Sequence, residues 1–106
     1  MSEVMITEEN FAAEVLESKV PVLIDFYADW CPPCKMMSPV VAKIAEEYAG
    51  RVKVGKINSD HAPKLAQKYD IMSIPNFLFF KDGEVKDNVI GAVPATELTG
   101  RLDKLL

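Results

Sequence analysis

Cys31 and Cys34 are the only cysteines of this 106-residue chain, and Pro32 and Pro33 fill the gap between them. Two thiols this close can form a structural disulfide, bind a metal or carry out redox chemistry. The metal site is the easiest to test, because zinc needs four protein ligands, or three and a water. The pair supplies two, and the only histidine, His61, lies far along the chain. We therefore expect no metal site within one chain, although metal shared between two chains stays open.

The place of the cysteine pair in the chain favours redox chemistry over inert buried thiols, which also pack well in cores. The pair follows an apolar strand and begins a helix, a junction where α/β proteins form their sites. At a helix N-terminus, free N–H groups and the helix dipole stabilise a thiolate, the nucleophile of disulfide exchange. One turn later a second sulfur lies close enough to form a disulfide and reopen it.

The elements that must position the pair can be predicted from hydrophobic patterns. Residues 20–28 are nearly all apolar, as in a strand covered on both faces. A helix should follow from Pro33 to Gly50, with Pro39 inside it. The other expected elements are a helix from Thr7 to about Ser18, a strand over 52–57, a helix over 62–69, strands over 76–80 and 85–90 joined by a turn at 81–84, and a helix over 94–106. This order predicts α/β layers around a mixed sheet.

Composition narrows the remaining possibilities. The length predicts a single domain over residues 1–106. A net charge of −4 argues against a nucleic-acid partner, and no apolar run approaches the roughly 18 residues of a membrane helix. The N-terminus carries no basic region or cleavage site, so we expect a cytoplasmic protein. We also expect a monomer. The cytosol keeps thiols reduced, which disfavours a structural disulfide. No glycine-rich nucleotide loop occurs, so we expect no bound cofactor.

With these features in place, the chain resembles a thioredoxin along nearly its whole length. The residues that carry the resemblance are Asp25–Lys35 (DFYADWCPPCK), Pro39, Lys56–Asn58, Ile74–Pro75, Phe80–Gly83 and Gly91. A Cys-x-x-Cys motif alone is weak evidence. It is much stronger after an apolar strand that contains Asp, and with Ile-Pro and another strand about 40 residues on. The resemblance implies the thioredoxin fold, a central five-stranded mixed sheet flanked by four helices, and the reduction of protein disulfides.

The resemblance also implies catalytic roles. Cys31 matches the exposed attacking nucleophile, and Cys34 the more buried resolving cysteine. Asp25 matches a buried acid that moves a proton for Cys34 through a water, and Lys56 matches the lysine beside it. A carboxyl group in an apolar strand is costly unless it is paired or neutral, and burial should raise its pKa. The alternatives are an aspartate that reaches a strand end and a solvated strand lysine.

Docking residues follow from the same match. Pro75 matches a cis-proline that faces the cysteines, and the backbone of Ile74 would pair with an extended substrate segment. Trp30, Ile74, Gly91 and Ala92 match the apolar collar on which targets dock. Plain packing is the alternative for Trp30.

Three positions depart from the usual family pattern. They are Pro32, where Gly is common, Ser73, where Gly is frequent, and Asn76, where Thr is usual. None of them threatens the fold, but Pro32 bears on redox tuning.

Proline fits the first turn of a helix, whose N–H groups have no partner within the helix. However, Pro32 and Pro33 each remove a donor that could face a sulfur, which leaves the Cys34 N–H as the nearest one. Fewer donors should raise the pKa of Cys31 and make the couple more reducing. Proline also stiffens the loop, with an effect whose sign the sequence does not give.

The expected partners are disulfide-containing proteins and a separate reductase, most simply a thioredoxin reductase. A rival with the same chemistry is an oxidase or isomerase domain, which would need a strongly acidified Cys31 and an export route. A rival of another class is a binding subunit that uses the collar without thiol chemistry. Serine substitutions at Cys31 and Cys34 distinguish these readings.

Overall fold

A mixed β-sheet forms the centre of the computed structural model, which describes residues 2–106. Within that range the strands lie in the order β1-β3-β2-β4-β5. They are β1 (Glu3–Met5), β2 (Val22–Tyr27), β3 (Lys53–Asn58), β4 (Asn76–Lys81) and β5 (Glu84–Ile90). β3 runs parallel to β1 and β2, whereas β4 is antiparallel to β2 and β5. This is the five-stranded mixed sheet that the resemblance implied.

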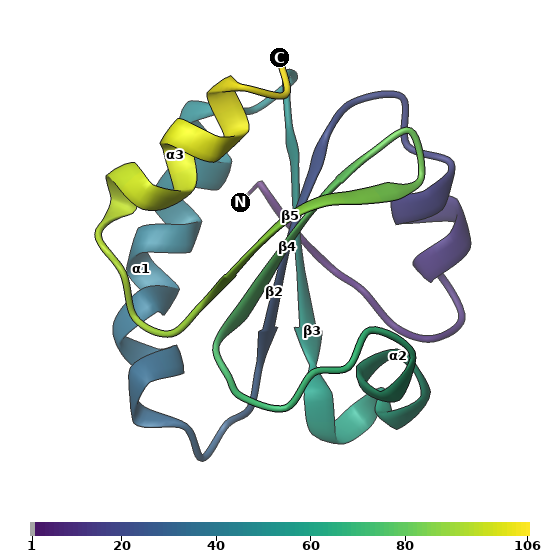
Figure 1. Ribbon diagram of the computed structural model, residues 1–106, viewed down its shortest axis with the longest axis vertical. Helices are drawn as coiled ribbons and strands as arrows, with labels where there is room; N and C mark the ends of the chain where they lie inside the picture. The colour runs from purple at the N-terminus through teal and green to yellow at the C-terminus, as the bar shows by residue number, and fades with distance from the viewer. Residues whose placement is uncertain (1) are drawn as a thin grey trace.

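Helices cover both faces of the sheet (Figure 1). They are η1 (Ala12–Leu16), α1 (Pro32–Glu47), the short η2 (Ser59–His61), α2 (Pro63–Lys68) and α3 (Ala95–Asp103). α1 and α3 lie on one face and η1 and α2 on the other. Strand side chains alternate between two apolar cores, so Leu23 packs on the α1 side and Ile24 on the η1 side. This explains why residues 20–28 are apolar at nearly every position.

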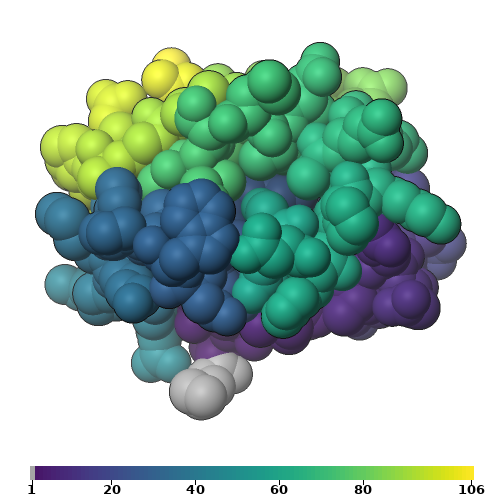
Figure 2. Space-filling model, turned by 90° about the horizontal axis from the view of Figure 1, so that it is seen from below, coloured from purple at the N-terminus to yellow at the C-terminus, as the bar shows by residue number. Residues whose placement is uncertain are grey.

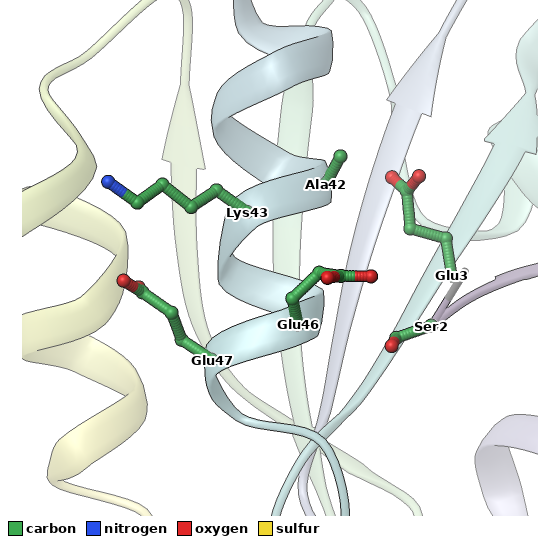
Figure 3. Close-up of a pocket in the computed structure, with 6 residues that line it drawn as sticks. All are labelled: Ser2, Glu3, Ala42, Lys43, Glu46 and Glu47. Carbon is green, nitrogen blue, oxygen red and sulfur yellow. The ribbon is translucent and has the colours of Figure 1, made fainter.

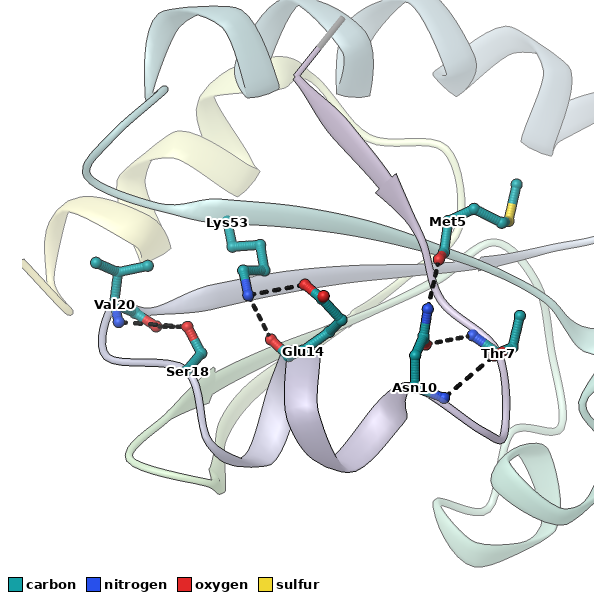
Figure 4. Close-up of polar contacts among 7 residues, drawn as sticks. All are labelled: Met5, Thr7, Asn10, Glu14, Ser18, Val20 and Lys53. Atoms are coloured by element: carbon teal, nitrogen blue, oxygen red, sulfur yellow. Dashed lines mark hydrogen bonds and ion pairs between the residues drawn. The ribbon is translucent and has the colours of Figure 1, made fainter.

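The N-terminal region differs from the prediction in two ways. β1 was not predicted, because three residues are too few to show an alternating pattern. The first helix also begins later than Thr7. Thr7 N–H donates to Asn10 Oδ1 at 2.7 Å and Asn10 N–H to Thr7 Oγ1 at 3.2 Å, so this stretch forms a turn ahead of η1 (Figure 4). Lys53 of β3 then fixes η1 by donating to the carbonyl and carboxylate oxygens of Glu14 (Figure 4).

The later elements agree with the sequence within a few residues. α1 begins at Pro32, one residue before the predicted start, and continues through Pro39. α3 ends at Asp103 rather than Leu106. The hairpin between β4 and β5 turns at Asp82 and Gly83, which both have positive φ, at 54° and 79°. That pair of angles is typical of a type I′ turn, for which Asp-Gly is a favoured sequence.

Candidate active site

Cys31 and Cys34 lie at the start of α1 and form a disulfide, with their Cα atoms 5.2 Å apart. Cys31 is the N-cap residue of the helix, and its extended backbone leads directly from the loop after β2. Cys34 N–H donates to Cys31 Sγ at 3.2 Å. Pro32 and Pro33 have no N–H to offer. The structure therefore has the one sulfur-facing donor that the sequence predicted.

The expected exposure of Cys31 was wrong. Cys31 is 3% exposed and Cys34 is 4% exposed, so both residues are buried in the disulfide form, and neither is more accessible. The bond to Cys34 and packing against Ala28, Tyr27 and Ile74 cover the Cys31 side chain.

The peptide bond between Ile74 and Pro75 is cis, as the resemblance implied. The Ile74 carbonyl oxygen lies 3.9 Å from Cys31 Sγ, which places this loop directly against the disulfide. The Pro75 carbonyl oxygen accepts from Gly91 N–H at 2.8 Å. Gly91 has a φ of +97°, a conformation that favours glycine. Cys31, Ile74, Pro75 and Gly91 are thus brought together, and the exposed Ala92 follows directly.

Asn76, which stands where the family usually has Thr, ties this loop to the sheet. It is buried, and its Oδ1 accepts from the side-chain amide of Asn88 in β5. The same amide donates to the Phe77 carbonyl oxygen at 3.0 Å. Ser73, the other departure in this loop, is exposed and lies on the solvent side.

Trp30 is not a packing residue, because its side chain is 67% exposed. Its indole Nε1 donates to Asp60 Oδ2 at 2.8 Å. Asp60 N–H in turn donates to Asn58 Oδ1 at 3.0 Å, and Asn58 Nδ2 donates to Asp29 Oδ2 at 3.4 Å. The exposed indole is therefore held by a short polar chain at the end of β3. Sequence reasoning missed the role of Asp60.

Two further apolar side chains, Met36 and Met72, are largely exposed at 68% and 89%. Met36 lies in the first turns of α1, and Met72 comes two residues before Ile74. Figure 2 shows the start of α1 (blue), η2 (teal) and the loop before β4 (green) meeting on one face of the molecule. Sequence reasoning passed over both methionines, because an unpaired methionine carries no pattern that separates surface from core.

Asp25 lies in the middle of β2 and is 1% exposed. It is the register partner of Lys56 in β3, and Lys56 Nζ lies 3.8 Å from Asp25 Oδ2. Burial raises the pKa of Asp25 from 3.8 to about 6, and the Lys56 cation opposes part of that rise. The Lys56 side chain is itself only 15% exposed. Both alternatives, a strand-end aspartate and a solvated lysine, are therefore wrong.

Among residues 2–106, no group of three or more His, Cys, Asp or Glu side chains could hold a metal ion. His61 is exposed in η2. No helix in the same range is long and apolar enough to cross a membrane.

Comparison with known proteins agrees with this geometry. The thioredoxin family model matches residues 2–104. Thioredoxin 1 of Synechococcus elongatus is 52% identical over 95% of this chain and 94% of its own length. Thioredoxin of Pyropia yezoensis is 50% identical over 100% of this chain and 99% of its own. The chloroplastic M-type thioredoxin of Spinacia oleracea is 48% identical over 95% of this chain but only 56% of its own length.

Proposed function

This chain belongs to the thioredoxin family and is a thiol–disulfide oxidoreductase that reduces protein disulfides, and on that premise we propose how each residue of its site takes part. The observation that carries the proposal is the Cys31–Cys34 disulfide at the N-terminus of α1. This disulfide is the oxidised form of a two-electron couple, and attack by one incoming thiolate breaks it.

In the proposed cycle the reduced protein begins with a Cys31 thiolate. It attacks one sulfur of a substrate disulfide and releases the other as a thiolate, which leaves a mixed disulfide. The Cys34 thiolate then attacks Cys31 Sγ and releases the second substrate thiolate. Two electrons pass to the substrate, and the Cys31–Cys34 disulfide is restored for reduction by a separate enzyme.

We propose that Asp25 accepts the proton that the Cys34 thiol loses. Resolution requires Cys34 to lose a proton, and an acid with a pKa of about 6 can accept one near neutral pH. Lys56 would stabilise the ionised carboxylate through its contact with Asp25 Oδ2. The buried position of the pair on the sheet face covered by α1 supports this assignment.

Docking is assigned to the apolar surface around the disulfide. Trp30 and Ile74 would contact an extended segment of the substrate, and the backbone of Ile74 would pair with it beside Pro75. Gly91 and Ala92 would border the segment on the other side. The exposure of the Trp30 indole supports this role, since a large apolar side chain is costly to leave in water.

The proposal also covers the domain organisation, oligomeric state, compartment and partners of the protein. Residues 1–106 would form one thioredoxin domain that acts as a monomer in a reducing compartment, the cytoplasm. The direct electron donor would be a thioredoxin reductase, and the substrates proteins with accessible disulfides. Relatives named chloroplastic make the compartment a point to test by localising the protein in its own cell.

The test is reduction of insulin disulfides, run once with a chemical dithiol and once with candidate reductases. We expect turnover in the dithiol arm and with at least one reductase. Cys31→Ser should abolish turnover in both arms. No turnover by the wild-type protein in either arm would favour the binding-subunit hypothesis, because that function would need neither Cys31 nor Cys34. Net oxidation of reduced substrates in place of reduction would favour the oxidase reading.

A further inference from the structure

Two buried carboxylate oxygens have no hydrogen-bond partner among residues 2–106: Asp25 Oδ1 and Glu3 Oε2. Unpaired buried acceptors are rare in folded proteins and cost free energy. The proposed mechanism accounts for Asp25. It gives no reason for Glu3, which begins the edge strand β1.

Strand register places Glu3 on the same sheet face as Asp25. Met5 is the register partner of Lys56, and Lys56 is the partner of Asp25. Glu3 lies two residues before Met5, and side chains two apart on a strand share a face. Figure 3 shows the Glu3 carboxylate on the α1 side of β1, near Ala42. Both orphaned oxygens therefore lie in the layer between the sheet and α1.

The charges that act on Asp25 in this layer are few. From β3, Lys56 favours the ionised form, and from β1, Glu3 disfavours it. The neighbouring side chains on β2 and β4 are the phenol of Tyr27 and the ring of Phe77. The buried residues of α1 carry no charge, and Cys34 among them does not titrate while the disulfide is closed. Asp25 is buried and the Lys56 side chain is largely buried, so their charges are screened less than charges at the surface.

We propose that Glu3 is a positioning residue for proton transfer: from the edge strand, its carboxylate opposes Lys56 and keeps Asp25 able to take up and release a proton. Without Glu3, the Lys56 cation would act on Asp25 unopposed. Asp25 would then stay ionised to lower pH and would be a weaker base for Cys34. This inference rests on the proposed role of Asp25.

The experiment titrates the Asp25 carboxyl by carbon NMR in the oxidised protein, where neither cysteine titrates. Glu3→Gln keeps the side-chain shape and removes the charge, and we expect a lower Asp25 midpoint than in the wild type. Glu3→Val introduces a neutral residue suited to a strand, and it should also lower the Asp25 midpoint. Glu3→Asp should return it toward the wild-type value. Glu47→Gln is the matched control: it removes the same charge from α1 in the same pocket (Figure 3), and it should leave the midpoint in place.

An unchanged Asp25 midpoint in both neutral Glu3 variants would overturn the inference. An equal shift in Glu47→Gln would also overturn it, because the effect would then come from net charge alone. The proposed function fails by a different result. If Asp25→Asn resolves mixed disulfides at the wild-type rate, Asp25 carries no proton for Cys34, yet the titration still decides whether Glu3 acts on Asp25. If both proposals hold, Glu3→Gln should move the pH profile of resolution toward lower pH.

Discussion

The backbone N–H of Cys34 donates to Cys31 Sγ at 3.2 Å. The two residues between them are prolines, so the first turn of α1 offers this sulfur no other backbone N–H from within the motif. The same N–H is placed to stabilise a thiolate on Cys31 when the disulfide opens. The nucleophile therefore depends on one donor where a Gly-Pro motif would offer two.

Pro32→Gly should lower the pKa of Cys31, because the new N–H adds a donor to the thiolate. Pro32→Ala adds the same N–H without the backbone freedom of glycine, so it separates donor loss from loop stiffness. The thiolate absorbance of the reduced proteins, followed against pH, measures both. A Cys31 pKa that stays unchanged or rises in the two variants would refute the donor argument.

Asp25→Asn should stabilise the oxidised protein at alkaline pH. Asp25 has a pKa of 3.8 when unfolded and about 6 when folded, so between these values the folded protein binds more protons and loses stability as pH rises. Above pH 6 the full cost is reached, up to about 3 kcal/mol. Asparagine removes this cost, although it leaves Lys56 without its partner.

Denaturant unfolding of the wild type and Asp25→Asn at pH 8 and pH 3.5 measures this effect. The variant should be more stable at pH 8, and the advantage should vanish at the lower pH, where the wild-type carboxyl is protonated in the folded state. Lys53 and Glu14 form an ion pair on the other sheet face, so Glu14→Gln serves as a control that should show no such gain. An equal advantage at both pH values would mean that packing, and not ionisation, separates the two proteins.

Asp60→Ala should weaken substrate docking through Trp30. The indole loses its only hydrogen bond in the described structure, worth about 1 kcal/mol, and the ring gains rotational freedom. We expect KM for a protein disulfide to rise several-fold with little change in kcat. Trp30 is the only tryptophan, so its fluorescence anisotropy reports the mobility directly.

Glu9→Ala is the matched control for charge, because Glu9 is exposed and takes no part in the polar chain from Trp30 to Asp29. It should leave the anisotropy close to the wild-type value. If Asp60→Ala left both anisotropy and KM unchanged, the hydrogen bond would have no part in holding the docking surface.

Sequence reasoning found the residues whose type and local spacing reveal their role. Cys31, Cys34 and Asp25 could be identified because a thiol pair at a helix start and a carboxyl in an apolar strand are local anomalies. The burial of Cys31 could not be foreseen, since it depends on Ile74, which is 43 residues away. The bond between Trp30 and Asp60 spans 30 residues in the same way.

The helices and strands also could be predicted where the sequence signal is local, and not where it depends on distant contacts. Long apolar segments such as β2 and α1 were predicted within a few residues, because many side chains share one period. β1 has three residues at a sheet edge, and its existence depends on pairing with β3. η1 begins later than predicted, because the side chains of Thr7 and Asn10 accept hydrogen bonds from each other's backbone N–H and close a turn. Contacts that arise only after folding set these features.

Cys34→Ser should stop the cycle at the mixed disulfide and so accumulate a covalent complex with substrate. Cys31 can still attack, but serine cannot displace the substrate sulfur, because an alcohol is far less acidic and less nucleophilic toward sulfur than a thiol. Incubation of reduced Cys34→Ser with an oxidised protein, followed by mass spectrometry under non-reducing conditions, should reveal one chain linked to one substrate through Cys31. A dithiol should release it. Cys31→Ser under the same conditions should form little complex, since Cys34 lies inside the first turn of α1, whereas Cys31 is the N-cap residue. Equal trapping by both variants would mean that the two sulfurs are interchangeable, and the assignment of attack to position 31 would be lost.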